Sequence, residues 1–262
     1  MTNATTPVLC TEEGAVARIA LNRPAAGNSL SMELVDAMRA ELGRLAGRKQ
    51  IKVIVLSGAG GRIFSAGHDL NEFDGQLDAD FLVRDFAGIT ALMQQIMAQP
   101  QIVIAKVEGV ATAAGCELVA ACDLALASSA ARFGVPGVNI GFWCHTPQVP
   151  LSRTVGCKAA MMMLVTGNLF PANHALTIGL INEVHEPEAL DAAVDALAAE
   201  IAGKAGSVLR RGKAAFARQR ALPLAEAYAF AREQALENIL DPDAREGIAA
   251  FLEKRQPRWP GG

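Results

Sequence analysis

The sequence predicts an α/β core followed by a helical C-terminal region. Short β-branched runs alternate with amphipathic helical segments over the first half of the chain. From about Gly156 onward almost every segment shows helical spacing of its apolar residues, with one short strand expected at 180–184. We therefore assign the α/β core to residues 1–200 and the helical region to residues 201–262.

The elements of the first half follow one another in order. Residues 8–9 and 15–21 flank a turn-like stretch and predict a hairpin, and residues 52–56 form the next strand. Ser31 is a suitable N-cap for a helix between them, whose apolar residues share one face. A second helix is expected over 81–98, ahead of a strand at 102–107. Later helices are expected at 158–166, 172–178, 188–202, 208–218, 223–238 and 245–254.

Composition and charge exclude several classes of partner. The chain has 262 residues, of which 51% are hydrophobic, so it can bury a large core. Its 24 basic and 27 acidic residues give a formal net charge of -3, which offers no basic field for nucleic acid and no polybasic membrane patch. No apolar run reaches transmembrane length. We expect neither nucleic acid nor a membrane as a partner.

The cysteines and the N-terminal residues bear on metal binding and location. None of the five cysteines lies in a CxxC pair or in a Cys/His pattern with zinc-ligand spacing, so no metal site is expected. Residues 1–6 are polar and uncharged, unlike a secretory signal or an Arg-rich transit peptide. Together these features predict a cytoplasmic protein with buried, reduced thiols.

Two glycine-containing segments, residues 58–70 and 107–118, each follow a predicted strand. Small residues at Ala113, Ala114 and Gly115 let a ligand approach the backbone closely. A helix that starts there directs unpaired N–H groups and the positive end of its dipole toward the ligand. An oxyanion would suit that position.

These segments also carry a resemblance to a known family. Residues 64–70 (FSAGHDL) and 113–118 (AAGCEL) resemble the two signatures of the crotonase, or enoyl-CoA hydratase/isomerase, family. The likeness extends from residues 20–24 (ALNRP) to 251–255 (FLEKR), so it covers nearly the whole chain. Within the family the sequence is most similar to the enoyl-CoA hydratase domain-containing proteins of mitochondria and their bacterial relatives.

The resemblance implies a fold, a substrate and an assembly. The implied fold is a crotonase core of repeated ββα units with a helical C-terminal trimerisation region. The implied substrate is an acyl-CoA thioester, so coenzyme A enters with the substrate and no separate cofactor is needed. The implied assembly is a homotrimer or a dimer of trimers. Apolar residues on the C-terminal helices agree with this assembly, namely Phe216, Tyr228, Phe230, Leu236 and Ile239.

The resemblance also assigns roles to individual residues. The backbone N–H groups of His68 and Ala114 would form an oxyanion hole for the thioester oxygen, and Glu117 would act as acid and base. A structural glutamate stabilised by the helix dipole remains an alternative for Glu117, and the His68 imidazole could take part in the chemistry as well. Contacts to coenzyme A would come from Arg23, Ala25, Ala66, His68, Asp69, Leu70 and Lys254, although Lys254 is equally explained by helix-dipole complementarity.

One position departs from the family pattern. Hydratases of this family carry a second glutamate after the proline of a Phe-Gly-x-Pro stretch, and this chain has Gly137 there. The loss leaves three alternatives: a weak hydratase, an isomerase that needs one base, or an acyl-CoA-binding homologue without effective turnover. Either Gly137 leaves an open gap, which Gly137→Glu would fill, or Asn139 or His145 has taken over the role of the missing second glutamate.

Overall fold

The computed structural model describes residues 6–73 and 78–261. Its larger sheet has six strands in the order β1-β2-β3-β5-β7-β10, all parallel except for the antiparallel pair β1 and β2. These strands are β1 Val8–Glu13, β2 Val16–Leu21, β3 Val53–Gly58, β5 Ile102–Val107, β7 Leu124–Ser128 and β10 Glu183–His185. The smaller sheet, β4-β6-β8-β9, consists of β4 Ile63–Ser65, β6 Val110–Thr112, β8 Arg132–Gly134 and β9 Phe170–Pro171.

A ββα unit recurs along the core, as the family resemblance implies. In each of the pairs β3–β4, β5–β6 and β7–β8, the first strand joins the larger sheet and the second joins the smaller one. A helix follows each pair, so the ends of the short strands lie next to helix starts. The core helices are α1 Met32–Ala46, α2 Ala79–Ala98, α3 Ala114–Ala121, α4 Gln148–Thr154, α5 Cys157–Thr166, α6 Ala172–Thr177 and α7 Leu190–Ala202.

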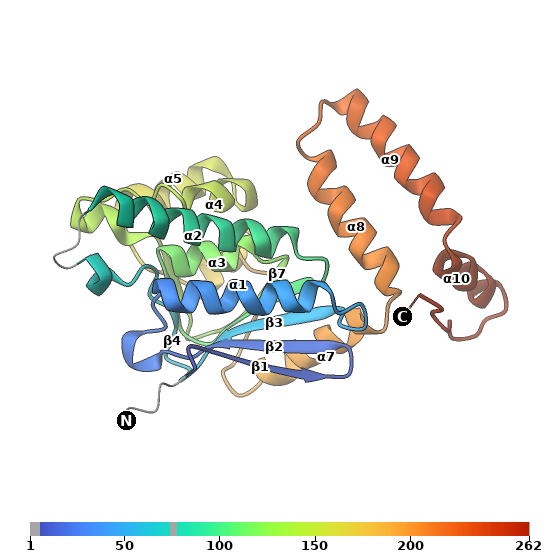
Figure 1. Cartoon of the computed structure of the whole chain (residues 1–262), viewed down its shortest axis with the longest axis horizontal. Helices are drawn as coiled ribbons and strands as arrows, with labels where there is room; N and C mark the ends of the chain where they lie inside the picture. Colours follow the sequence, from blue (N-terminus) through green and yellow to red (C-terminus); the bar gives the residue numbers. More distant parts are fainter. Residues whose placement is uncertain (1–5, 74–77, 262) are drawn as a thin grey trace.

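Helices cover both faces of the larger sheet. Figure 1 shows α1, α2 and α3 stacked over one face and α7 on the other. The Ser31 side chain accepts from Leu34 N at 3.3 Å and caps α1, and the predicted apolar row of that helix is buried against the sheet. On the opposite face, Leu190 and Val194 of α7 pack on the strand residues Val53 and Ile104. The burial of apolar surface on both faces explains the near-continuous hydrophobic runs of the central strands.

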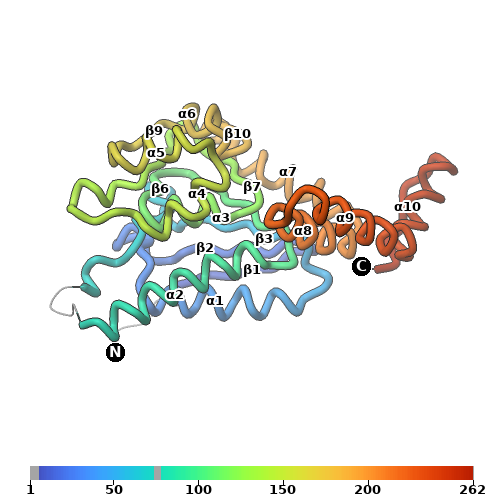
Figure 2. The backbone as a smooth tube through the Cα atoms, turned by 90° about the horizontal axis from the view of Figure 1, so that it is seen from above, coloured from blue at the N-terminus to red at the C-terminus, as the bar shows by residue number. Residues whose placement is uncertain are grey.

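Three further helices extend from the core. They are α8 Gly206–Gln219, α9 Leu224–Ile239 and α10 Pro242–Leu252, and Figures 1 and 2 both show them projecting to one side. Lys213 of α8 fastens them to the core, since its Nζ lies 2.6 Å from Asp123 Oδ2 and 3.0 Å from the Gln101 carbonyl oxygen. Large apolar side chains on these helices remain exposed, among them Phe216, Tyr228 and Phe251. None of the described helices is long and apolar enough to cross a membrane.

Several sequence expectations differ from the structure in detail. The strand expected at 180–184 starts only at Glu183, because residues 178–182 are occupied by the turn after α6. Helix α4 was not expected, since its seven residues are too short to show a clear apolar period. Helical spacing places Phe86 on the inner face of α2, but it is only half-buried, whereas the neighbouring Asp85 is buried. Residues 1–5, which entered the argument about targeting, lie outside the described residues.

Candidate active site

An unusual backbone turn starts α3. Ala113 has φ 50° and ψ -121°, a conformation that costs a non-glycine residue of the order of 1–3 kcal/mol. The Ala113 N–H donates to the Gly134 carbonyl oxygen at 2.9 Å, which holds this turn against β8. The next N–H, that of Ala114, has no acceptor among the described residues. The turn therefore presents the first N–H of α3 as an open donor.

A second open donor lies on the neighbouring segment. Gly67 has φ 92°, and a Cβ placed on it would lie 3.0 Å from Ala114 N and 2.8 Å from Ala113 Cβ. The flanking groups are occupied, because Leu30 N donates to the Gly67 carbonyl at 2.7 Å and Gly67 N donates to Ser65 Oγ at 3.2 Å. The His68 N–H has no acceptor among the described residues. Two unpaired donors thus come from segments in direct contact.

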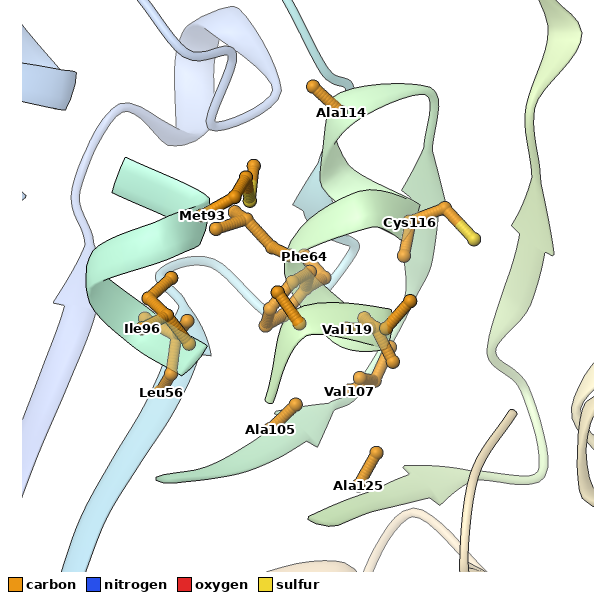
Figure 3. Close-up of a cluster of buried hydrophobic side chains, with 14 of the residues drawn as sticks. Leu56, Phe64, Met93, Ile96, Ala105, Val107, Ala114, Cys116, Val119 and Ala125 are labelled. Carbon is orange, nitrogen blue, oxygen red and sulfur yellow. The ribbon is translucent and has the colours of Figure 1, made fainter. Parts of the chain in front are cut away.

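Helix α3 packs unusually close to β4. A Cβ on Gly115 would collide with the Ser65 carbonyl oxygen and lie 2.8 Å from Ser65 Cβ, so only glycine fits there. Figure 3 shows Ala114 at the end of α3, with Phe64 and Val119 in the cluster of buried side chains around the helix. All eight residues of α3 are buried. The donor at Ala114 is therefore held on a rigid element, as preorganised stabilisation of charge requires.

Glu117 is the one acidic residue of α3. Its side chain is 3% exposed, and its Oε2 accepts a hydrogen bond of 3.0 Å from Thr146 Oγ1. Burial raises the pKa of Glu117 to about 7, while the Thr146 bond opposes that rise. Both protonation states are then populated near neutral pH, which is the property that an acid and base needs.

The structure contradicts the interpretation of Gly137 as an open gap. Gly137 is buried, and a Cβ there would collide with the Phe142 carbonyl oxygen and lie 2.9 Å from Cys144 Sγ. The Phe142 N–H also donates to the Gly137 carbonyl at 3.0 Å, which closes the loop over this position. Asn139 donates to the Gly167 carbonyl at 3.1 Å, and His145 is exposed. No slot for a larger side chain exists at Gly137.

A family model described as Enoyl-CoA hydratase/isomerase matches residues 11–262. The chain belongs to the enoyl-CoA hydratase/isomerase family. This confirms the family predicted from the sequence, its α/β fold, and an enzyme of the hydratase or isomerase type.

Relatives of this family member span nearly its full length. A protein of Xenopus laevis named enoyl-CoA hydratase domain-containing protein 3, mitochondrial, is 39% identical over 95% of this chain and 84% of its own length. A solved enoyl-CoA hydratase of Mycobacterium smegmatis is 42% identical, with a TM-score of 0.93 over 97% of this chain and 98% of its own. The human enoyl coenzyme A hydratase domain-containing protein 3 is 37% identical, with a TM-score of 0.94 over 97% and 100%.

The predicted cytoplasmic location is contradicted by these relatives. The Xenopus protein and its counterparts from Danio rerio and human are all named mitochondrial. The composition of a short N-terminal stretch is a weak guide to the compartment of a family member. The expectation of a cytoplasmic protein was therefore wrong.

Most residues assigned to coenzyme A lie on two neighbouring loops, and Lys254 lies apart from them. Arg23 Nη1 lies 2.8 Å from Asp69 Oδ2, and Ala66 N donates to the Gly27 carbonyl at 2.9 Å, so the loops around 23–28 and 66–70 are joined. Ala25, Ala66 and Leu70 are exposed on these loops. The exposed Lys254 follows α10, and Figure 1 shows that helix far from the start of α3.

Two residues of this site escaped the sequence argument. Thr146 lies 29 positions from Glu117, and no local pattern links them. Asp85, whose Oδ2 lies 3.4 Å from His68 Nε2, did carry a signal, because it is an acidic residue four positions before Ile89 on the buried stripe of α2. Within residues 6–73 and 78–261, no group of three His, Cys, Asp or Glu side chains is placed to share a metal ion.

Proposed function

We propose that this protein processes acyl-CoA thioesters by stabilising an enolate, with Glu117 as the acid and base. The family to which it belongs acts on acyl-CoA substrates. The observation that carries the proposal is the position of Glu117 on α3, three residues after Ala114. Residues at that spacing share a helix face. The open donor and the titratable carboxylate therefore serve the same reacting group.

The chemistry follows from these groups. The thioester oxygen accepts hydrogen bonds from the His68 and Ala114 N–H groups, which stabilise the negative charge that develops when the thioester becomes an enolate. A donor of this kind contributes about 3 kcal/mol to the barrier reduction. In hydration, the Glu117 carboxylate takes a proton from water as the water oxygen bonds to the β-carbon. A proton must then reach the α-carbon to complete the addition.

The loops beside this site are proposed to hold the coenzyme A part of the substrate. Arg23, Ala25, Ala66, Asp69 and Leu70 lie on two joined loops next to the His68 donor. Coenzyme A enters and leaves with the acyl group, so the reaction needs no separate cofactor. Lys254 would contribute only to the site of another subunit, because α10 extends away from this core.

Steady-state hydration of short and medium trans-2-enoyl-CoA tests the proposal. Glu117→Gln keeps the size and the capacity to accept from Thr146 but removes the proton transfer, so kcat should fall by about 10² to 10⁴-fold. Glu13→Gln is the matched control, because Glu13 is exposed on β1. Activity unchanged by Glu117→Gln would refute the assigned role.

An isomerase is the second candidate, and Gly137 favours it. Shifting a double bond from the 3- to the 2-position needs one base that takes a proton from the α-carbon and returns it to the γ-carbon. Glu117 is the single carboxylate on this helix, and the residue directly after Pro136 is Gly137 instead of a second glutamate. Conversion of 3-enoyl-CoA in the same preparation decides between the two reactions, since a hydratase would favour the 2-enoyl substrate.

A homologue that binds without effective turnover is the third candidate. The steric closure at Gly137 supports it, because the second carboxylate of a hydratase has no place there. Calorimetry would then report binding of an acyl-CoA while an acyl panel shows no hydration and no isomerisation. Measurable turnover of either substrate class removes this candidate.

The protein is further proposed to form a homotrimer or a dimer of trimers. The helices α8, α9 and α10 leave large apolar side chains exposed, including Leu224, Tyr228, Phe251 and Leu252. Exposed apolar surface of this extent marks a protein interface. Light scattering should return three or six times the chain mass, and a monomer in dilute solution would contradict the proposal.

A further inference from the structure

A buried carboxylate lies beside the proposed oxyanion hole without a role in the mechanism above. Asp85 of α2 is 3% exposed, and its Oδ2 lies 3.4 Å from Nε2 of His68. Both atoms are fully buried, and neither has a hydrogen-bond partner among the described residues. A buried carboxylate is costly unless it is paired. His68 is the group placed to pair with it.

The His68 ring is fixed by its neighbours. Its centroid lies 5.2 Å from that of Phe86 and 6.0 Å from that of Phe73. The His68 side chain is 13% exposed, and no described residue forms a hydrogen bond with its Nδ1. The ring thus turns one nitrogen toward Asp85 and leaves the other open.

An aromatic row connects the His68 ring with the loop before α4, which contacts Glu117 of α3. Phe86 stacks on Phe142 with centroids 6.1 Å apart, and Phe142 contacts the His145 ring at 6.1 Å. His145 precedes Thr146, the hydrogen-bond donor to Glu117. His68 and Glu117 therefore border one region, and the backbone N–H of His68 is one of its two open donors.

We propose that Asp85 and His68 form a carboxylate–imidazole pair that makes the His68 ring a second proton carrier of this site, with Asp85 as its positioning residue. The proposal rests on the proposed function and supplies the step that it leaves open. As Glu117 takes a proton from water and the oxygen bonds to the β-carbon, Nδ1–H of the His68 imidazolium gives its proton to the α-carbon, whose enolate electron pair forms the C–H bond. The ring becomes neutral, and the proton on Glu117 returns to it through solvent.

In this arrangement the Asp85 carboxylate orients the His68 imidazole. A carboxylate that accepts from one ring nitrogen sets the tautomer, leaves the other nitrogen for chemistry, and stabilises the imidazolium. A site with two glutamates has a second carboxyl group that can protonate the α-carbon. Position 137 has no room for that side chain here, so another proton carrier such as His68 is needed. Asp85 is the only charged residue on the buried face of α2 within its described length.

Kinetics of three variants test the pair. His68→Phe keeps the backbone N–H and the aromatic packing, so kcat for hydration should fall about 10²-fold while KM changes less than about threefold. Asp85→Asn should lower kcat about tenfold in the same way. Asp36→Asn, an exposed aspartate on the adjacent α1, is the control and should leave both constants unchanged. A kcat of His68→Phe within about threefold of wild type overturns the proposal.

The tautomer of His68 gives a readout that does not require turnover. The chain has four histidines, so their ring nitrogens can be resolved in a long-range ¹⁵N–¹H spectrum. Neutral His68 should carry its proton on Nε2 in the wild type and lose that preference in Asp85→Asn. A neutral His68 ring that carries its proton on Nδ1 in the wild type, or the same spectrum in both proteins, overturns the assignment of Asp85.

Exchange of the α-proton of bound acyl-CoA with D₂O separates this proposal from the proposed function. Exchange should persist in Glu117→Gln and disappear in the double variant Glu117→Gln, His68→Phe. Failure of hydration and isomerisation with this exchange intact would refute the proposed reactions and leave the His68 pair standing. Absence of exchange in Glu117→Gln would overturn His68 as a proton carrier.

Discussion

Thr146 Oγ1 donates a 3.0 Å hydrogen bond to Oε2 of Glu117 across the space between α3 and the loop before α4. Burial raises the pKa of Glu117 to about 7, and this single hydrogen bond opposes the rise. The hydroxyl favours the carboxylate because the charged form is the stronger acceptor. Thr146 therefore sets how much of Glu117 is ready to accept a proton at neutral pH.

Thr146→Val should lower hydration at pH 7 by about 3- to 10-fold, since losing a hydrogen bond to the charged form raises the pKa of Glu117 further. The rate limb that depends on the carboxylate should move to higher pH, and wild type and variant should converge near pH 9. Thr146→Ser keeps the hydroxyl and serves as the control. A pH–rate profile of the valine variant that coincides with wild type would contradict this role.

Glu117→Gln should make the protein more stable at high pH. The pKa of Glu117 is raised on folding from its ordinary value of 4.5 to about 7, so the unfolded chain releases its proton first and stability falls as pH rises between these values. The loss amounts to about 3 kcal/mol above pH 8. Glutamine carries no charge, so the variant does not undergo this loss of stability.

Urea unfolding at pH 5 and pH 8 measures this difference. The variant should gain little at pH 5 and about 2–3 kcal/mol at pH 8. Equal stability of the two proteins at both pH values would show that Glu117 is not held in a desolvated site.

Gly137→Ala should destabilise the protein by about 2 kcal/mol or more, because its Cβ would collide with the Phe142 carbonyl oxygen and crowd Cys144 Sγ. Gly137→Glu should consequently fail to raise hydration. Gly212→Ala is the control, since Gly212 is exposed inside α8 with nothing within 4 Å of an added Cβ. A stable Gly137→Glu variant with increased hydration would mean that the loop opens at low cost.

Lys213→Met should loosen the attachment of α8 to the core. The variant leaves Asp123 without its 2.6 Å partner, and burial already raises the pKa of that carboxyl. A loss of about 2 kcal/mol is expected, part of which Asp123→Asn in the same chain should restore. Lys204→Met is the control, because Lys204 forms only an exposed ion pair with Glu200. Denaturant unfolding of the wild type, the single variants Lys213→Met and Asp123→Asn, and the double variant gives the coupling energy directly.

The sequence by itself determined the elements and the family. Ser31 and the apolar row after it predicted α1, and the small residues 113–115 predicted a helix start with open donors. These features depend on neighbours within a few positions, where the periodicity of side chains and the rules of capping act. The signatures at 64–70 and 113–118 are local in the same way. For this reason they could be interpreted without knowledge of the packing.

Only the tertiary structure decided what surrounds the proposed acid and base. Glu117 meets Thr146 from another unit, His68 meets Asp85 from α2, and Gly137 is closed by Phe142. Each of these contacts depends on how the ββα units stack, which follows from the burial of whole faces and not from any one segment. A buried side chain takes its pKa and its partner from that packing. The sequence thus shows which groups are available, and the packing determines which of them can act together.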